Sequence, residues 1–333
     1  MGTITRRTDN VGRATYQVKI RRKGYPSASQ TFDDKLAAET WMQETEAAMT
    51  RGAFIDPTPA RDTTLDDLLR RYTEEVSPHK RGHEVERIRL AFLLRQPIAL
   101  TTLANLSASM VRDYRDTRLQ TVAGSTVNRE LNLLGHVIET ARKEWGIQMR
   151  GNPVQEVRRP RNPPARDRRL RAGEEARLLA ACGTSRGGFL LDCVRLAIET
   201  AMRQSELVDL DWKDVDLERR VVRLHDGATK NGHGRGVPLS STALAVLQQR
   251  GPSAGPVFPG VTSEAVKQAF AKAAARAGMP DLHFHDLRHE AVSRLFERGF
   301  NVMEAAAVSG HRDLSMLRRY VHLEASALAT RLG

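Results

Sequence analysis

Cysteine is almost absent from this chain of 333 residues, which contains only Cys182 and Cys193. Two cysteines cannot form a disulfide framework, and these two lack the spacing of a metal site. The residues before Arg13 are polar and charged, which argues against a secretory signal peptide. No apolar run approaches the roughly 18 residues that a membrane-spanning helix needs. These absences predict a cytoplasmic protein with no role in a membrane.

Acidic side chains are in the minority, with 40 Asp and Glu against 52 Lys and Arg, so the net charge is +12. Residues 1–30 carry seven basic side chains against one acidic, and residues 150–171 carry eight against two. Each segment therefore has a charge of +6, while the rest of the chain is neutral. Concentrated positive charge on a neutral body is typical of contact with a polyanion, because each neutralised phosphate releases a counterion. A purely solubilising or connecting role is the alternative.

The N-terminal region has the pattern of a small sheet with one helix. Residues 14–21 alternate between apolar and polar side chains, residues 27–32 suit a return strand, and a helix is expected over 35–50. The apolar face of the first strand holds Tyr16, Val18 and Ile20. Such a sheet can enter a DNA groove, although a solvated sheet without a partner is the alternative. Candidate DNA contacts in this domain, residues 1–57, are Arg21, Arg22 and Lys23.

Residues 62–152 contain four or five amphipathic segments with short connections, which predict a compact all-α domain. Thr64, Ser107 and Ser125 are expected to cap three of its helices. Residues 153–169 are rich in proline and arginine, so they cannot form a regular element and predict an extended basic linker. Candidate DNA contacts in this linker are Arg158, Arg159, Arg161, Arg168 and Arg169.

Residues 170–333 are expected to be helical with one β-hairpin, so the predicted fold class of the chain is mainly α with small β-sheets. Arg203 and Glu206 are three residues apart and can interact on one helical turn, which would fix the guanidinium for a phosphate. Lys230 lies at the Gly-rich hairpin tip, from which it can donate a proton to a phosphodiester. A surface ion pair and an exposed turn lysine are the alternatives. No Gly-Lys-Ser/Thr sequence follows, which argues against an ATP site.

Two further clusters lie near the carboxyl end. His285 and Arg288 are spaced to point the same way from a new helix and can bind one phosphate and move one proton. A zinc site that also uses His283 and His289 is an alternative without support from cysteines or a His-Glu-x-x-His pattern. In the last cluster a glycine permits a sharp turn before His311. Asp313 can then cap the helix that carries Tyr320, a residue type that is usually only a packing group.

Together the four clusters resemble the tyrosine recombinase (phage integrase) family in order, spacing and residue type. The family's motifs match the chain at Arg203, Glu206, Leu207, Lys230, His285, Arg288, Gly310, His311 and Tyr320. Residues 281–294 and 301–323 are most similar to the shufflon-type DNA invertases of that family. One departure is Ala201, where the family commonly has glycine. The resemblance implies an arm-type DNA-binding domain over 1–57, a SAM-like core-binding domain over 62–152 and a catalytic domain over 170–333.

The resemblance also implies a reaction, the cleavage and rejoining of DNA through a 3′-phosphotyrosyl intermediate. Tyr320 would be the nucleophile, and Arg203 and Arg288 would stabilise charge on the phosphate oxygens. The general base, the general acid, the phosphate contact and the orienting carboxylate would be, in that order, His285, Lys230, His311 and Glu206. The chemistry requires no metal or other cofactor. A type IB topoisomerase, or a DNA-binding regulator whose site has decayed, is the competing hypothesis.

The expected partner is double-stranded DNA, which places the protein at the nucleoid. Recombination of two duplexes needs four active sites, so a homotetramer is expected on DNA and a monomer off it. Accessory DNA-bending proteins are compatible with the resemblance. Beyond Tyr320 an apolar stripe recurs at helical spacing and could pack on its own subunit or on a neighbouring one. Its members are Val321, Ala325, Leu328 and Leu332.

Overall fold

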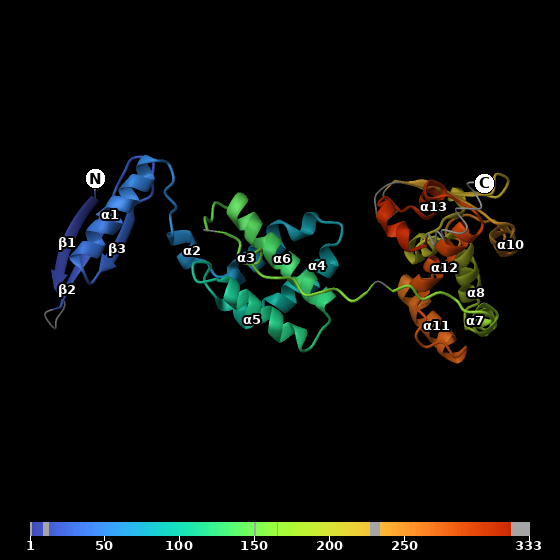
Figure 1. Cartoon of the computed structure of the whole chain (residues 1–333). Helices are drawn as coiled ribbons and strands as arrows, with labels where there is room; N and C mark the ends of the chain where they lie inside the picture. Colours follow the sequence, from blue (N-terminus) through green and yellow to red (C-terminus); the bar gives the residue numbers. More distant parts are fainter. Residues whose placement is uncertain (1, 9–12, 150, 165, 227–233, 321–333) are drawn as a thin grey trace, which may run out of the picture. The chain divides into compact units, whose positions relative to one another are not determined.

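A computed structural model describes residues 2–8, 13–149, 151–164, 166–226 and 234–320 of the chain (Figure 1). The chain divides into two compact units, Met1–Pro164 and Ala165–Gly333, and the boundary falls inside the predicted linker. The finer division of the first unit into a sheet domain and a helical domain stays a prediction. No helix in the described ranges is long and apolar enough to cross a membrane.

A three-stranded antiparallel sheet and one helix begin the first unit. These elements are β1 (Gly2–Thr8), β2 (Ala14–Ile20), β3 (Ala28–Phe32) and α1 (Lys35–Thr50). Val18 and Ile20 are fully buried with Ala38 and Met49 of α1, and Tyr16 packs beside them, which confirms the predicted apolar strand face. The helix bounds expected over 35–50 are also confirmed. The strand β1 was not predicted, because its side chains are mostly exposed and polar and show no apolar alternation.

Short helices with their own apolar core form the rest of the first unit. They are α2 (Thr58–Asp62), α3 (Leu65–Glu75), η1 (Ser77–His79), α4 (His83–Leu93), η2 (Pro97–Leu100), α5 (Ala108–Leu119) and α6 (Gly124–Lys143). The caps expected at Thr64 and Ser107 are confirmed, since both side chains accept a backbone N–H of the first turn. The cap expected at Ser125 is wrong. The helix α6 begins at Gly124 with Ala123 as its N-cap, two residues before the predicted cap, and a Cβ at Gly124 would lie 2.5 Å from the Arg161 carbonyl oxygen.

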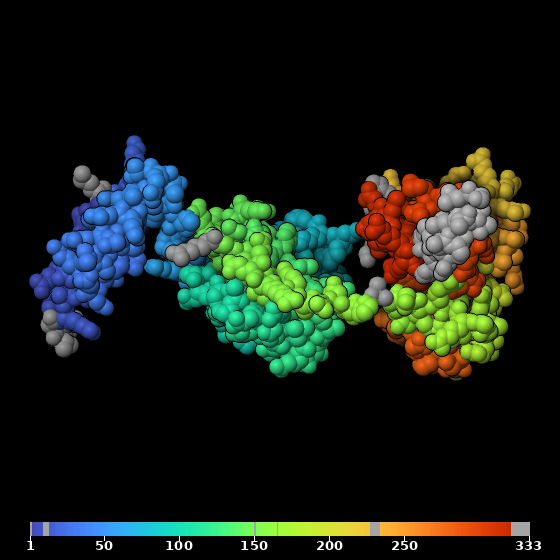
Figure 2. Space-filling view, in the orientation of Figure 1, coloured from blue at the N-terminus to red at the C-terminus, as the bar shows by residue number. Residues whose placement is uncertain are grey.

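The proline- and arginine-rich linker is fastened at both of its ends. On the first unit Arg115 donates to the Arg158 carbonyl and Asn128 donates to the Pro160 carbonyl, each at 2.8 Å. Figure 2 shows this stretch, in light green, running over the surface of the helical part. Within the second unit the linker is held by ion pairs of three arginines with buried carboxylates. These pairs are Arg166 with Asp286, Arg168 with Glu174 and Arg169 with Glu290.

In the second unit the helix α12 packs against other helices, and a small antiparallel sheet lies against α13 (Figure 1). Its helices are α7 (Glu174–Gly183), α8 (Phe189–Thr200), α9 (Gln204–Val208), η3 (Trp212–Asp214), α10 (Ser241–Arg250), α11 (Ser263–Arg276), α12 (Phe284–Glu297), α13 (Val302–Ser309) and η4 (Leu314–Tyr320). Its strands are β4 (Val215–Asp216), β5 (Val221–Leu224) and β6 (Arg235–Pro238). The hairpin expected here is present, and the predicted fold class, mainly α with small β-sheets, is confirmed.

Glu290 is the centre of the linker's attachment to the second unit. Its buried carboxylate accepts from Arg169 at 3.1 and 3.2 Å, from the Leu170 backbone at 3.1 Å and from Arg294 at 2.7 Å. We expect Glu290→Gln to lower the free energy of unfolding by about 2 kcal/mol, because the neutral amide at this buried position loses its charge-assisted hydrogen bonds to the partly exposed guanidiniums of Arg169 and Arg294.

The matched control is Glu297→Gln. Glu297 also pairs with Arg169, but its side chain is 55% exposed, so the loss should stay below about 1 kcal/mol. Urea unfolding of the full chain at pH 7 measures both values. Equal losses in the two variants would contradict the central place of Glu290.

Candidate active site

The carboxylate of Glu206 is fully buried and joins two arginines. It lies in the first turn of α9, where it accepts from Arg203 Nη1 at 2.7 Å and from the Arg203 backbone N–H at 2.9 Å. Arg235, the first residue of β6, donates to its two oxygens at 3.1 and 2.7 Å. Burial alone would raise the pKa of Glu206, but the hydrogen bonds of Arg235 and Arg203 outweigh burial and lower the pKa to about 2. Glu206 is therefore a permanent anion between two cations.

Arg288 is also buried, with only 4% of the residue exposed, but its guanidinium is held by backbone carbonyls. It donates to the carbonyl of Ala201, which ends α8, and at 2.6 Å to that of Ser309, the last residue of α13. Burial, and then the neighbouring Arg203, lower the pKa of Arg288 to about 9. Within the described ranges no carboxylate pairs with this guanidinium. A buried cation held in this way is a site prepared for an anion.

The C-terminus of α13 brings the three arginines together. Three consecutive carbonyls accept from three different guanidiniums: Val308 from Arg235 at 3.0 Å, Ser309 from Arg288 at 2.6 Å, and Gly310 from Arg203 at 3.3 Å. The last carbonyls of a helix have no partner within it and carry partial negative charge, so they suit cations. Gly310 ends the helix with φ +72°, a left-handed conformation that glycine adopts without strain.

His311 follows this turn and faces the same cluster of charges. Its Nδ1 lies 2.7 Å from the Ser309 hydroxyl, which itself donates to the Ala305 carbonyl at 2.5 Å. Because that hydroxyl has only one proton, the hydrogen bond to His311 must be donated by Nδ1–H. Burial, and then the positive charges of Arg288 and Arg203, lower the pKa of His311 to about 4. The DNA-free ring is therefore neutral at pH 7, with an unprotonated Nε2.

Tyr320 lies at the end of η4, and only 9% of the residue is exposed. Its ring is stacked between His289, at 5.9 Å between centroids, and Phe296, at 6.4 Å. Its hydroxyl is hydrogen-bonded to Nδ1 of His289. Burial raises the pKa of Tyr320, and the charges of Arg319 and Arg288 offset part of this effect. Asp313, expected to cap the helix that carries Tyr320, accepts the Ser315 backbone N–H at 2.9 Å, which confirms that expectation.

His285, the predicted general base, is exposed and lies edge-on to His289 with 5.0 Å between ring centroids. Desolvation of the ring, and then the charge of Arg288, lower the pKa of His285. The described hydrogen-bond partner of the Tyr320 hydroxyl is His289 and not His285. Lys230, the predicted general acid, lies outside the described residues, as does the apolar stripe beyond Tyr320. No three His, Cys, Asp or Glu side chains in the described part of the chain are grouped as metal ligands.

The structure therefore brings six of the predicted residues into one cluster: Arg203, Glu206, His285, Arg288, His311 and Tyr320. Sequence reasoning missed two members. Arg235 was seen only as part of a Gly-rich hairpin tip, and His289 only as a ligand of the alternative zinc site. The signal for Arg235 was its place at the start of a strand next to that tip. The signal for His289 was its position directly after Arg288 and four residues after His285.

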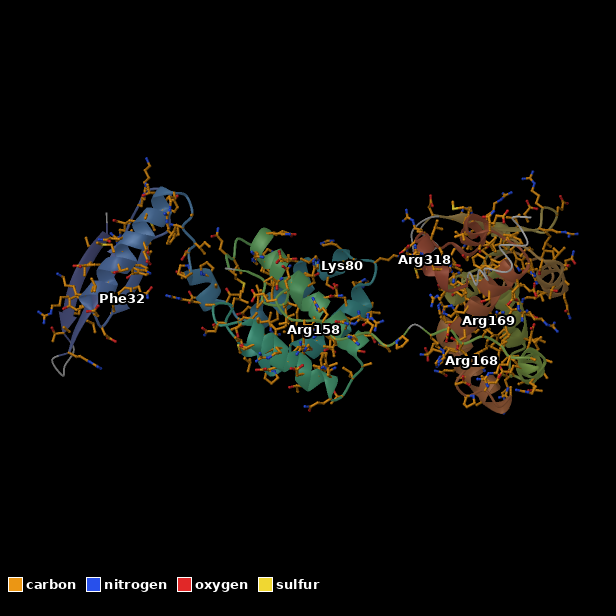
Figure 3. All side chains as sticks on the ribbon, in the orientation of Figure 1. Phe32, Lys80, Arg158, Arg168, Arg169 and Arg318 are labelled. Atoms are coloured by element: carbon orange, nitrogen blue, oxygen red, sulfur yellow. The ribbon has the colours of Figure 1, made fainter. Side chains whose placement is uncertain are left out.

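The basic residues predicted to contact DNA fall into two groups. Figure 3 labels Arg158 of the first group and Arg168 and Arg169 of the second. The first group is exposed and comprises Arg21, Arg22, Lys23, Arg158, Arg159 and Arg161. The second group is matched by carboxylates. Arg168 pairs with Glu174 and Asp281, and Arg169 pairs with Glu290 and Glu297. Their positive charge is thus already compensated within the second unit.

Comparison with known proteins gives one consistent result. Residues 168–327 match the phage integrase family. A shufflon-specific DNA recombinase of Escherichia coli is 43% identical over 287 residues, which cover 83% of this chain and 73% of that protein. A putative integrase/recombinase of Haemophilus influenzae is 34% identical and covers 91% of this chain and 83% of its own length. These matches confirm the resemblance drawn from the motif positions.

Solved structures share the fold at lower identity. A lambda integrase tetramer bound to a Holliday junction has a TM-score of 0.65 at 19% identity, covering 95% of this chain and 94% of its own. The Tn1549 transposon integrase in complex with a circular intermediate DNA has a TM-score of 0.69 at 16% identity, covering 81% and 99%. At these identities the similarity supports the architecture of the chain and not the role of any side chain.

Gly310→Ala tests the link between the end of α13 and Glu206. A Cβ at Gly310 would lie 2.9–3.0 Å from the Arg235 guanidinium, so we expect Arg235 to move away from Glu206. In the wild type the depressed pKa of Glu206 contributes stability that is present above about pH 4.5 and lost as the pH falls toward 2. Between pH 6 and pH 3 this loss is about 2 kcal/mol. Gly310→Ala should show a clearly smaller acid-dependent loss.

The control is Gly278→Ala. Gly278 has φ +77° and open space around it, so its substitution has the same left-handed strain of about 1 kcal/mol without displacing a side chain. It should keep the wild-type acid dependence. Urea unfolding at pH 6 and pH 3 measures each variant, and an unchanged acid dependence in Gly310→Ala would disprove the coupling.

Proposed function

The chain belongs to the phage integrase family of tyrosine recombinases, and on that basis we propose how its residues cut and rejoin DNA. Tyr320 attacks the scissile phosphate and remains bonded to the 3′ phosphate while the 5′ oxygen departs. The single observation that carries this assignment is the buried guanidinium of Arg288, held by carbonyls close to Arg203 and Tyr320 and lacking a described carboxylate partner. A phosphodiester supplies the anion that such a site lacks.

Charge stabilisation is the main contribution of the arginines. A phosphodiester already carries a negative charge that repels a nucleophile, and more charge develops on its oxygens as the attack proceeds. Arg288 and Arg203 are fixed before DNA arrives, so they need not reorganise during the reaction. Glu206 and Arg235 hold Arg203 in place and do not themselves need to touch the phosphate.

The remaining roles follow from protonation states. The neutral His311 has a lone pair on Nε2, so a hydrogen bond to the phosphate requires a proton at that position, and we propose that this proton is taken up when DNA binds. Lys230 protonates the departing 5′ oxygen. The phosphotyrosyl ester conserves the energy of the broken bond, so a second 5′ hydroxyl can reverse the chemistry on a new strand without a cofactor.

The DNA contacts outside the active site are proposed from charge and exposure. The arm-type domain over 1–57 would use Arg21, Arg22 and Lys23, and the linker would use Arg158, Arg159 and Arg161. These exposed side chains can each neutralise a phosphate. Arg168 and Arg169 are matched by carboxylates, so we assign them to fastening the linker to the catalytic domain over 170–333. The helical domain over 62–152 would bind the DNA next to the site of cleavage.

Assembly follows from the reaction. Two recombining duplexes contain four strands to be cut, so four active sites are needed. We propose a homotetramer on DNA that forms from monomers, with accessory DNA-bending proteins as further partners and the nucleoid as the place of action. One structure of similar fold is a lambda integrase tetramer on a Holliday junction.

Tyr320→Phe tests the nucleophile directly. On a suicide substrate with a nick beside the scissile phosphate, the wild type should accumulate a covalent protein–DNA adduct, because the released fragment diffuses away. The variant should form no adduct while still binding the DNA. Tyr114→Phe, in the helical part of the first unit, should still form the adduct. An adduct formed by Tyr320→Phe would show that another residue is the nucleophile.

Arg288→Gln tests the phosphate site on the same substrate. We expect single-turnover cleavage to slow by about 100- to 1000-fold with DNA affinity little changed, because the lost charge acts mainly in the transition state.

A supercoiled DNA circle that carries two copies of the site distinguishes recombination from relaxation of supercoils. Relaxation without joining of the two sites would support the topoisomerase alternative.

A further inference from the structure

We propose that His289 is a further catalytic residue, whose Nδ1 accepts the phenolic proton of Tyr320 as the tyrosine oxygen attacks the phosphorus. This inference rests on the proposed role of Tyr320 as the nucleophile. The proton acceptor is then His289 and not His285, the general base that the family resemblance implied. His285, which is exposed, then remains available to contact the phosphate.

The geometry of α12 carries the assignment. His289 and Phe296 are seven residues apart, so they lie on the same face of this helix, and the Tyr320 ring is stacked between them with interplanar angles of 29° and 12°. This stacking fixes the plane of the ring and the position of its hydroxyl oxygen. Its hydroxyl meets Nδ1 of His289, and both residues are less than 10% exposed. Arg288, the immediate neighbour of His289, extends to the phosphate site.

The charges around His289 determine the protonation state of its ring in the absence of DNA. His285 and Arg288 face it from its own helix and Arg319 from η4, and Asp286 gives a smaller opposite effect. Burial, and then these positive groups, lower the pKa of His289 to about 4, so the ring is neutral at pH 7. A neutral imidazole has one acceptor nitrogen, and the phenol has a proton to donate, so we assign the tautomer in which Nδ1 accepts and Nε2 carries the hydrogen.

A base at this position is required by the burial of the nucleophile. Burial raises the pKa of the Tyr320 phenol, so solvent cannot remove the proton easily at neutral pH. As the bond between Oη and phosphorus forms and the bond from phosphorus to the 5′ oxygen breaks, the phenol becomes strongly acidic. Its proton moves to Nδ1 of His289, and the 5′ oxygen receives a separate proton from the general acid. Rejoining reverses both transfers.

The test uses a variant that places an amide where Nδ1 of His289 lies. In His289→Asn, the amide can keep the hydrogen bond to Tyr320 but cannot take its proton. We expect single-turnover cleavage of the nicked substrate to slow by about 100-fold at pH 7. The rate should then rise steadily up to pH 9, because the phenol must lose its proton to solvent. The wild-type rate should be nearly flat over the same range.

His285→Asn is the matched control on the same helix face. It should lower the rate but keep the flat wild-type profile, since the proton acceptor is intact. His289→Gln provides a second variant, with its amide nearer to the Nε2 position, and should behave like His289→Asn. DNA binding of each variant confirms that it is folded.

Two outcomes overturn the proposal. One is a His289→Asn variant with the wild-type rate and profile, and the other is a steep pH dependence in His285→Asn but not in His289→Asn. Neither outcome bears on the identity of the nucleophile, which Tyr320→Phe tests separately. Adduct formation by Tyr320→Phe would instead refute the proposed function on which this inference rests.

Discussion

Three buried or half-buried guanidiniums share one helix end, and only two of them share a carboxylate; the active site depends on that imbalance. Val308, Ser309 and Gly310 each offer a carbonyl to a different arginine, so the end of α13 sets the positions of all three. Glu206 compensates Arg203 and Arg235, while Arg288 is left with carbonyls only. The free energy of holding Arg288 in this state is offset when an anion binds. In the proposed function, the pocket would therefore favour a phosphate before any covalent chemistry occurs.

The conformation of the backbone contributes to this site as much as the side chains do. Ala201 ends α8 with φ +53°, a left-handed conformation that costs a non-glycine residue about 1 kcal/mol. In that conformation its carbonyl accepts from Arg288. The family commonly has glycine here, and the positive φ explains that preference physically. Alanine keeps the same turn because its methyl group is buried in the apolar cluster that also contains Tyr320.

Local patterns predicted what depends on near neighbours in the chain. The pairing of Arg203 with Glu206, the caps at Thr64 and Ser107, and the helix over 35–50 all follow from spacing of a few residues. The partner of the Tyr320 hydroxyl did not follow, because it depends on how η4 meets α12 in space. Arg235 was missed for the same reason, since its carboxylate lies 29 residues away. The concentration of arginine in the linker predicted DNA contact, but half of these arginines form ion pairs with carboxylates elsewhere in the same chain.

In the proposed reaction, burial of Tyr320 affects two steps through one physical effect. Desolvation makes the phenol a poor acid, which is a disadvantage for attack and creates the need for a proton acceptor such as His289. The same exclusion of water would protect the proposed phosphotyrosyl ester from hydrolysis until a 5′ hydroxyl arrives. An exposed tyrosine would ionise more readily but would lose the stored bond energy to water. An enzyme that must rejoin what it cuts therefore gains more from a buried nucleophile with a fixed base than from an accessible one.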